Sequence, residues 1–171
     1  MLSNEPRKEI FSTQRLNSSD LASLKSIRLE ALEREPNVFG STFESESQMT
    51  DGEWLDMLNN NSCAYFALKV GADTVGLTGI HTIKENPTQA KLFGSYIRAE
   101  YRLMGGSESL YKVRLEWAKE NGLAEIIVSH RASNISSKRA NQKHGFVYTH
   151  CEPHTWNDGQ TEDNVFYKLK L

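Results

Sequence analysis

The segment 100–107, Glu-Tyr-Arg-Leu-Met-Gly-Gly-Ser, joins a predicted strand to a predicted helix. Residues 91–97 before it read as extended and partly apolar, whereas Leu110, Val113 and Trp117 after it recur at helical spacing. The free N–H groups of a first helical turn and the helix dipole favour an anion there, and the two glycines allow a ligand to approach the backbone. Glycine turns also begin many helices that bind nothing, so the turn alone predicts either a phosphate site or a simple helix start.

The other elements follow from hydrophobic spacing, helix caps and turn residues. Before the turn, we predict a strand at 9–16, a helix from 21 to about 35 that Pro36 ends, a short helix after the capping box at 50–53, and strands at 64–70, 74–83 and 90–97. After the turn, we predict a helix ending near Gly122, a strand at 123–128, a helix from the Ser133 cap to about His144, and strands at 146–151 and 164–171. The segments 39–43, 85–89 and 152–163 are predicted as irregular connections.

This order of elements favours one type of architecture. Three strands joined by short connections form an antiparallel meander, and the strand–helix units that follow favour a mixed sheet with helices on both faces. We therefore predict a mixed α/β (α+β) fold, with a central, largely antiparallel sheet of about seven strands flanked by about four helices. The length of 171 residues, with 38% hydrophobic and 25% charged residues, is typical of one soluble domain, which we place at 1–171.

The charge of the chain limits the partners that we expect. A net charge of −2 and an isoelectric point near 6.2 give no general attraction to nucleic acid or to a membrane surface, so phosphate recognition would have to be local. The basic residues that can form a local patch are Arg98, Arg102, Lys138, Arg139 and Lys143.

The cysteines and the N-terminal segment bear on metal binding and location. Cys63 and Cys151 lack the spacing of a metal or redox site, so we predict free thiols and no metal. The polar segment 1–9 is unlike a signal peptide, and no apolar run reaches membrane-spanning length. We therefore predict a cytoplasmic protein, and an edge strand at the C-terminus makes a homodimer plausible.

A second motif lies in the C-terminal part of the chain. It reads Asn134-x-x-Ser137-x-x-Ala140-x-x-Lys143-His144-Gly145-Phe146. Together with the turn Arg102–Ser107 and its approach Ile97–Tyr101, this motif resembles the two signatures of the GNAT superfamily of acyl-CoA N-acyltransferases, in the same order and on the same elements. Residues 28–41 also resemble the first two helices of many members. Chance agreement of all three regions is much less probable than that of one glycine turn.

The resemblance implies a binding mode for acetyl-CoA. Its pyrophosphate would lie on the backbone N–H groups of the turn, and its pantetheine arm between the parallel strands that end at Ile97 and Val128. A backbone N–H near Ile97 would polarise the thioester carbonyl. The cofactor-binding residues that the resemblance implies are Ile97, Arg98, Arg102, Leu103, Met104, Gly105, Gly106, Ser107 and Asn134.

Several of these residues also have a purely structural interpretation. Arg102 can form a solvated ion pair with Glu100, and Asn134 can serve as a helix cap. Gly105 and Gly106 can serve only a tight turn. The residues alone leave these alternatives open.

The catalytic residues are less well indicated. Asn141 stands where many members of the family carry a tyrosine that is thought to protonate the departing thiolate, and no glutamate stands in the strand at 90–97, where some members keep a base. Attack by an amine requires a group that accepts a proton, and His81 is the first side chain that we would test. Other candidates without a decisive feature are Glu44, Glu46 and Tyr96, and Asn141 can hydrogen-bond the sulfur.

The resemblance implies an N-acetyltransferase that moves the acetyl group from acetyl-CoA to a primary amine of a small molecule or peptide, by direct attack in a ternary complex. Residues expected to shape the acceptor pocket are Phe39, Phe43, Trp54 and 154–156. An alternative is a non-catalytic acyl-CoA-binding or regulatory module of the same fold. A phosphate-binding domain for another nucleotide ranks lower because the turn lacks the lysine and serine or threonine that end a P-loop.

Overall fold

The computed structural model of the protein describes residues 10–171. Glu9 of the first predicted strand, and the segment 1–9 on which the signal-peptide prediction rests, lie outside the described residues. The elements, in chain order, are β1 Ser12–Arg15, the 3-10 turn Ser18–Asp20, α1 Leu21–Arg34, α2 Phe43–Ser47, α3 Asp51–Asn59, β2 Cys63–Val70, β3 Asp73–Ile83, β4 Asn86–Ile97, the 3-10 turn Ala99–Tyr101, α4 Gly106–Glu120, β5 Glu125–Arg131, α5 Ile135–Lys143, β6 Val147–Thr155 and β7 Thr161–Lys170.

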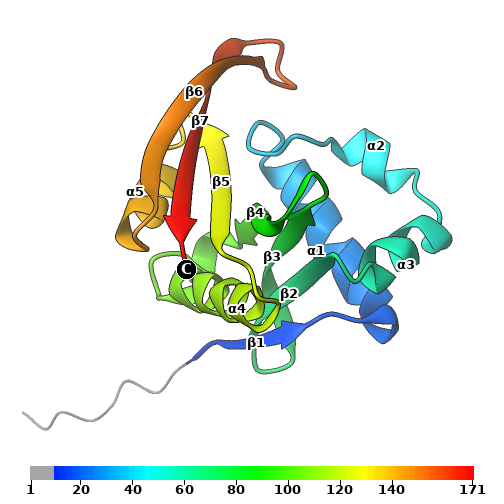
Figure 1. Cartoon of the computed structure of the whole chain (residues 1–171). Helices are drawn as coiled ribbons and strands as arrows, with labels where there is room; N and C mark the ends of the chain where they lie inside the picture. Colours follow the sequence, from blue (N-terminus) through cyan, green and yellow to red (C-terminus); the bar gives the residue numbers. More distant parts are fainter. Residues whose placement is uncertain (1–9) are drawn as a thin grey trace, which may run out of the picture.

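The strands form one mixed sheet, which confirms the predicted fold class. Within residues 10–171 its seven strands lie in the order β1-β2-β3-β4-β5-β7-β6 (Figure 1). The pair β4–β5 is parallel, and the other neighbouring pairs are antiparallel. The parallel pair consists of the strand before the glycine turn and the strand after the following helix, as the order of elements predicts.

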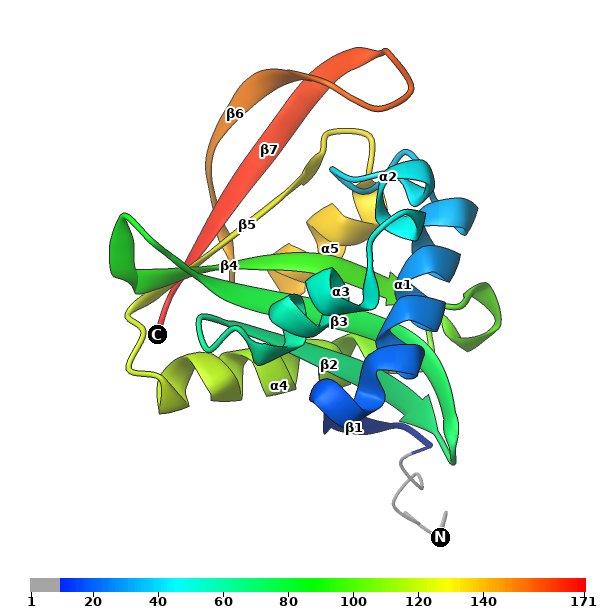
Figure 2. The same ribbon diagram turned by 90° about the vertical axis from the view of Figure 1, so that its right-hand side faces the viewer.

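Helices cover both faces of the sheet (Figure 2). On one face, α1 and α3 bury Leu24, Ile27 and Trp54 against the strands β2, β3 and β4. On the other face, α4 buries Trp117 in a second cluster with residues of β2, β3, β4 and β5. Trp54 is fully buried, so it belongs to the core and does not contact an acceptor.

Two predicted connections were wrong, and one helix was not predicted. Residues 39–42 are irregular, as predicted, but Phe43 begins a further helix, α2, whose N-cap Thr42 accepts a hydrogen bond from the N–H of Ser45. The predicted loop 85–89 is mostly the start of β4, where Pro87 lies at the beginning of a strand and does not interrupt a long ladder. The predicted excursion 152–163 is mostly paired, because β6 and β7 form a hairpin out to the pair Thr155–Thr161.

The helix α5 begins one residue later than predicted. Its N-cap is Asn134 and not Ser133, because the Asn134 side chain accepts a hydrogen bond from the N–H of Ser137, at 3.1 Å. Among residues 10–171, no helix is both long and apolar enough to cross a membrane.

The parallel pair β4–β5 separates after a short contact. The paired residues are Gln89 with Glu125, Ala90 with Ile126, and Lys91 with Ile127. Between Phe93 and Tyr96 the register of β4 against β3 shifts, and Gly94 has a φ of +64°, a left-handed conformation that favours glycine. This bulge turns β4 away from β5, so the two strands diverge toward their carboxyl ends.

Candidate active site

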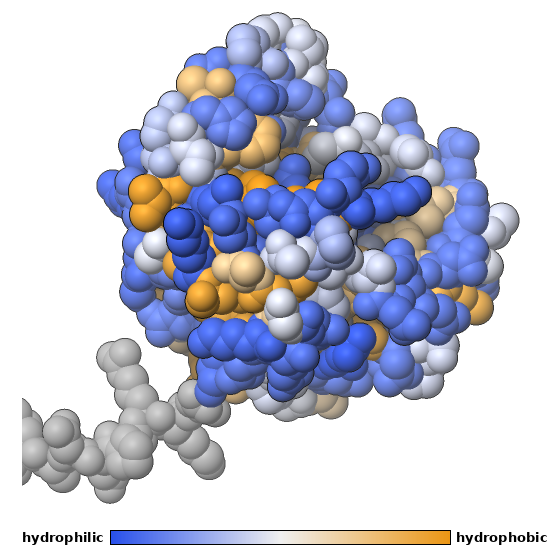
Figure 3. Space-filling model, viewed as in Figure 1, coloured by the Kyte–Doolittle hydropathy of each residue, from blue (hydrophilic) through white to orange (hydrophobic). Residues whose placement is uncertain are grey.

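A cleft of about 820 Å³ opens where β4 and β5 diverge. Its walls come from residues 92–97 of β4, 128–131 of β5, one side of α4, one side of α5, residues 34–39 after α1, and Asp158 at the tip of the β6–β7 hairpin. The surface is hollowed between this hairpin and the α1–α2 segment (Figure 3). The cleft therefore lies at the carboxyl ends of the two parallel strands, where α/β sheets usually bind ligands.

The glycine turn provides a row of free N–H groups at one side of this cleft. The backbone N–H groups of residues 103–107 make no hydrogen bond to any part of the chain from 10 to 171, whereas the N–H groups of Glu108 and Ser109 bond to the carbonyl of Gly105. Leu103 has a φ of +60° and Gly105 a φ of +95°, so the turn passes twice through the left-handed region. Successive N–H groups in such a turn, at the start of a 15-residue helix, form a binding site for phosphate oxygens.

The two glycines of the turn have different roles. A Cβ on Gly105 would meet nothing within 4 Å, so glycine is needed there for its backbone conformation. A Cβ on Gly106 would lie 2.7 Å from Cδ2 of Leu68, so glycine is needed there for the packing of α4 on β2. The prediction that both glycines leave space for a ligand is therefore wrong for Gly106, whose missing side chain faces the core.

The two arginines near the turn pair with carboxylates in α1 or directly after it. The Nε and Nη2 atoms of Arg98 donate hydrogen bonds to the two carboxylate oxygens of Glu30, each at 2.8 Å. Arg102 pairs with Glu35, and its Nε donates to the Ile97 carbonyl at 2.8 Å. The suggested ion pair of Arg102 with Glu100 is therefore wrong. Arg102 lines the cleft, whereas Arg98 lines a smaller neighbouring hollow.

The predicted basic patch does not form in the cleft. Lys143 pairs with Glu108 at the first turn of α4. Lys138 and Arg139 are exposed on α5, and neither lines the cleft. Of the five basic residues proposed from the sequence, Arg102 is the one that lies in its wall.

The two asparagines of the second motif both line the cleft. Asn134 also caps α5, so its structural interpretation is confirmed. Asn141 is buried, and its Oδ1 accepts a hydrogen bond from the hydroxyl of Tyr111, while its Nδ2 has no partner among the described residues. Tyr111 is a cleft residue that sequence reasoning missed, because at helical spacing it reads as a core residue of α4.

The histidine in the cleft is not the one that the sequence suggested. His81 pairs with Lys91 across β3 and β4, packs against Phe93 with ring centroids 5.5 Å apart, and does not line the cleft. His130, near the end of β5, does line the cleft and is 7% exposed. Its Nδ1 lies 2.8 Å from the Arg131 carbonyl oxygen, and its Nε2 has no partner in the described part of the chain. The strand was predicted to end at Val128, whereas β5 continues to Arg131, so the sequence did not place His130 in a strand.

Tyr96 lies in the opposite wall, beside α1. Its hydroxyl donates a hydrogen bond to Glu30 at 2.9 Å, and burial together with this carboxylate raises the pKa of Tyr96 to about 12. A phenol with this pKa is protonated at neutral pH and is a poor base. Of the two suggested glutamates, Glu46 is buried in an ion pair with Arg28, and neither lines the cleft.

The hairpin tip contacts the segment after α1 at one side of the cleft mouth. Nδ2 of Asn157 donates hydrogen bonds to the carbonyls of Phe39, at 3.0 Å, and Ser41, at 3.1 Å. Arg131 of β5 pairs with both Asp158 and Glu162, and its guanidinium lies 5.5 Å from the Trp156 ring centroid. Phe39 lines the cleft, whereas Phe43 is exposed elsewhere.

Within residues 10–171, no group of three or more His, Cys, Asp or Glu side chains is arranged to hold a metal ion. Cys63 and Cys151 are both free, as predicted. Burial raises the pKa of the Cys63 thiol, which leaves it protonated at neutral pH.

The cleft between two diverging parallel strands, with a glycine turn at its edge, agrees with a known family. The model of the acetyltransferase (GNAT) family matches residues 26–146, which is most of the chain and includes both sequence motifs. The protein belongs to this family. No curated protein matches the sequence.

Solved structures share the fold at low sequence identity. The protein yncA of Salmonella typhimurium, solved with its cofactor acetyl-CoA, is 14% identical with a TM-score of 0.78, over 95% of each chain. RimL, a ribosomal L7/L12 alpha-N-protein acetyltransferase in complex with coenzyme A, is 14% identical with a TM-score of 0.76, over 97% of each chain. A ribosomal-protein-alanine N-acetyltransferase from Brucella melitensis is 19% identical with a TM-score of 0.77, over 94% of this chain and 99% of that chain.

Proposed function

We propose that this protein is a single-domain N-acetyltransferase that moves the acetyl group of acetyl-CoA to a primary amine. The observation that carries the proposal is the row of free N–H groups at residues 103–107, placed at the edge of the cleft between β4 and β5. The N–H groups receive the pyrophosphate, and the gap between the strands receives the pantetheine arm. Relatives in fold that hold acetyl-CoA or coenzyme A support this assignment.

The reaction is direct attack of the amine on the thioester in a ternary complex. Gly94 and Ser95 lie outside the register that pairs β4 with β3, so their backbone N–H groups are our candidates to polarise the thioester carbonyl. The amine approaches from the side of the cleft formed by residues 34–39 and Asp158. Two of the fold relatives are named for acetylating proteins, one of them on an alpha-amino group, which supports an amine as the acceptor.

Binding of acetyl-CoA is tested by thermal unfolding. At a concentration of about 100 times Kd, a ligand that binds only the folded state adds about 2.7 kcal/mol, which for a chain of this length raises Tm by about 5–10 °C. Gly105→Glu places a carboxylate among the phosphate-binding N–H groups, so we expect it to abolish this rise. Gly122→Glu is the matched control, because Gly122 also has a positive φ (+67°) and an open Cβ position but lies just after the C-terminal end of α4, at the opposite end of the helix from the turn.

Turnover separates an enzyme from an acyl-CoA-binding module of the same fold. We expect release of free CoA thiol to depend on an added amine, within a panel of peptides with free N-termini, lysine derivatives, polyamines and amino sugars. Binding of acetyl-CoA without amine-dependent release across the panel would favour the non-catalytic module. An unchanged Tm in millimolar acetyl-CoA would refute both.

A further inference from the structure

Arg114 of α4 is a buried cation without an anionic partner. Its side chain is among the largest that are fully buried, at 2% exposure. Its Nε donates a hydrogen bond to the Leu110 carbonyl and its Nη1 to the Ser95 hydroxyl, each at 3.0 Å. Neither partner carries a charge, and no carboxylate between residues 10 and 171 forms an ion pair with it. Its Nη2 makes no hydrogen bond to the same part of the chain.

Burial of such a charge is unfavourable, so packing alone does not explain it. An unpaired ion in a protein interior loses hydration that neutral hydrogen bonds replace only in part. Burial lowers the pKa of Arg114 to about 10, which still leaves the guanidinium protonated at neutral pH. An apolar side chain of similar volume would fill the same space without this cost.

The position of Arg114 in the cleft limits what it can bind. It lines the cleft together with Leu92 and Val128, which directly follow the last paired residues of β4 and β5. Its bond to the Ser95 hydroxyl also places the guanidinium beside the bulge at Gly94, where β4 turns away from β5, so Arg114 is near the closed end of the gap between the strands. Its Cα lies eight residues after that of Gly106, about 12 Å along the helix axis, and its side chain runs back only as far as the Leu110 carbonyl, so the guanidinium lies beyond the first turn of α4.

Neighbouring side chains hold the guanidinium in place. Its central carbon lies 4.6 Å from the ring centroid of Tyr111, and the Tyr111 hydroxyl is bonded to Asn141 of α5. The Tyr111 ring also stacks on His144, with centroids 4.0 Å apart. Tyr111 is therefore a positioning residue that fixes the cation between α4 and α5.

This inference rests on the proposed function, in which the pyrophosphate of acetyl-CoA is bound at the turn. The pantetheine arm then places the thioester near the closed end of the gap between β4 and β5. We propose that Arg114 stabilises the CoA thiolate as it leaves. The amine nitrogen bonds to the carbonyl carbon, the C–S bond breaks, and its electron pair stays on sulfur beside the guanidinium. The nitrogen loses its proton to water, and the thiolate takes up a proton from water when CoA is released.

The pKa of the thiol in bound CoA tests this directly and needs no acceptor. The probe is CoA itself, titrated by the ultraviolet absorbance of its thiolate, with the complex of desulfo-CoA as the spectral reference. A cation within reach of the sulfur lowers a thiol pKa by about 1–3 units, so we expect the bound thiol to titrate at least about one unit below free CoA. Arg114→Met is expected to bring the value back to that of free CoA, and Arg114→Lys to keep part of the shift.

Control variants separate this effect from a general loss of structure. Arg139→Met removes an exposed arginine outside the cleft and is expected to leave the bound thiol unchanged. Tyr111→Phe keeps the ring against the guanidinium and is expected to retain the shift, whereas Tyr111→Leu is expected to reduce it.

The wild-type measurement alone can overturn the inference, even if Arg114→Met does not fold. A bound CoA whose thiol titrates like free CoA would refute the role of Arg114 and leave the proposed function intact. The same holds if a folded Arg114→Met variant retains the full shift. Failure of the wild-type protein to bind CoA would refute the proposed function itself, and this inference with it.

Discussion

Glu30 of α1 connects the helix to the strand that forms one wall of the cleft. Its carboxylate accepts two hydrogen bonds from Arg98 and one from Tyr96, both in or directly after β4. The Glu30 side chain is 20% exposed, so water screens the pair only in part. Hydrogen bonding from Arg98, more than any other cause, lowers the pKa of Glu30.

This carboxylate makes stability depend on pH in a defined direction. Because its pKa is lower in the folded than in the unfolded state, its contribution is complete above the ordinary glutamate pKa and is lost as pH falls through the folded value. We expect Glu30→Gln to reduce the free energy of unfolding by about 1–2 kcal/mol at pH 7, and the difference from wild type to shrink as pH falls below about 4. Urea unfolding at a series of pH values measures this.

Glu33→Gln is the matched control for this prediction. Glu33 is exposed on the same helix, and its side chain forms no ion pair or hydrogen bond within the described residues. Its substitution is expected to change stability by less than about 0.5 kcal/mol at every pH. A loss for Glu30→Gln that stays constant down to pH 3 would show that the pair does not act through its charge.

Roles of single residues were predicted well where the chemistry is local and poorly where a partner is distant in sequence. The capping box predicted at 50–53 forms, because Thr50 accepts a hydrogen bond from the N–H of Glu53, only three positions later. Arg98 and Arg102, in contrast, pair with acids 68 and 67 positions away, and no local pattern reveals such contacts. The same limit explains why His81 was chosen and His130 was missed, because only the folded sheet shows which histidine reaches the cleft.

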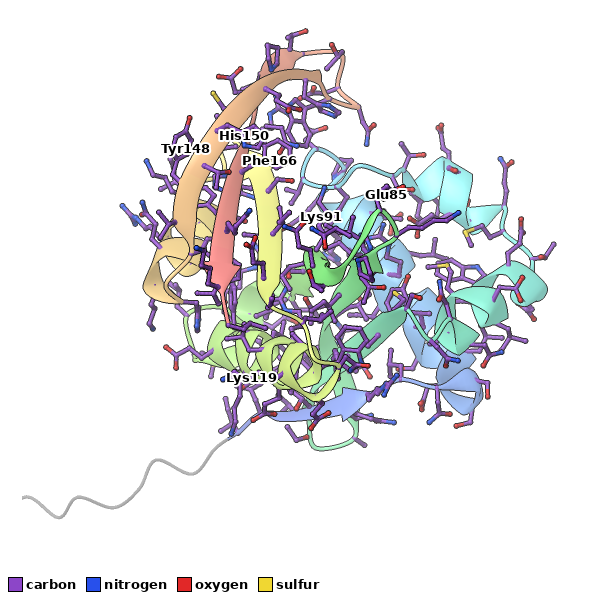
Figure 4. The ribbon with its side chains drawn as sticks, in the orientation of Figure 1. Glu85, Lys91, Lys119, Tyr148, His150 and Phe166 are labelled. Carbon is purple, nitrogen blue, oxygen red and sulfur yellow. The ribbon has the colours of Figure 1, made fainter. Side chains whose placement is uncertain are left out.

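The β6–β7 hairpin is the element that sequence patterns described least well. Every residue of β6 is exposed, and its outer part, 152–155, has no hydrophobic alternation by which it could be recognised, so the predicted strand ended at Cys151. It is held by pairing with β7 and by contacts such as His150 on Phe166, whose ring centroids lie 4.5 Å apart (Figure 4). Lys91, the last β4 residue paired with β5, lies 5.8 Å from the Phe166 ring centroid in the same region.

Asn157 at the tip of this hairpin forms hydrogen bonds to the segment 35–42, which connects α1 to α2. Its two hydrogen bonds, to the carbonyls of Phe39 and Ser41, connect the two sides of the cleft mouth. We expect Asn157→Ala to cost about 1 kcal/mol or less in global stability, because the bonds are near the surface. The effect on local opening of the segment that these bonds hold is expected to be larger than the effect on global unfolding. Amide hydrogen exchange at residues 36–41 is therefore expected to become faster.

Asn37→Ala is the control for this element, since Asn37 lies in the same segment but makes no hydrogen bond within the described part of the chain. Asn37→Ala is expected to leave amide hydrogen exchange at the hairpin tip unchanged. If Asn157→Ala alters amide exchange in neither segment, the two hydrogen bonds do not hold the two segments together in solution.

At the scale of the whole molecule, the order of elements predicted the sheet and the position of its parallel pair. These depend on long segments with clear periodicity, which tolerate errors of a few residues at each boundary. The sequence did not reveal how far β4 and β5 stay together. The length of this contact depends on the bulge at Gly94. A glycine permits the left-handed backbone conformation found there but does not require it, so the sequence does not predict the bulge.

The short contact between β4 and β5 divides the sheet into two parts. Strands β1 to β4 form one part and β5 to β7 the other, and the ladder that joins them directly has only the pairs from Gln89–Glu125 to Lys91–Ile127. The helix α4 and the Asn157 contacts connect the parts elsewhere. Beyond Lys91 the strand edges that face the gap have backbone groups available for another hydrogen-bonding partner.

A bound pantetheine arm would fill this gap and connect both parts. We therefore expect acetyl-CoA to slow amide exchange in residues 92–97 of β4 and 128–131 of β5 together, as well as in the turn 103–107. Inorganic pyrophosphate occupies only the turn, so it is expected to protect 103–107 and to leave the two strand edges unchanged. Equal protection by both ligands would show that the arm does not lie between the strands, even if the phosphates are bound at the turn.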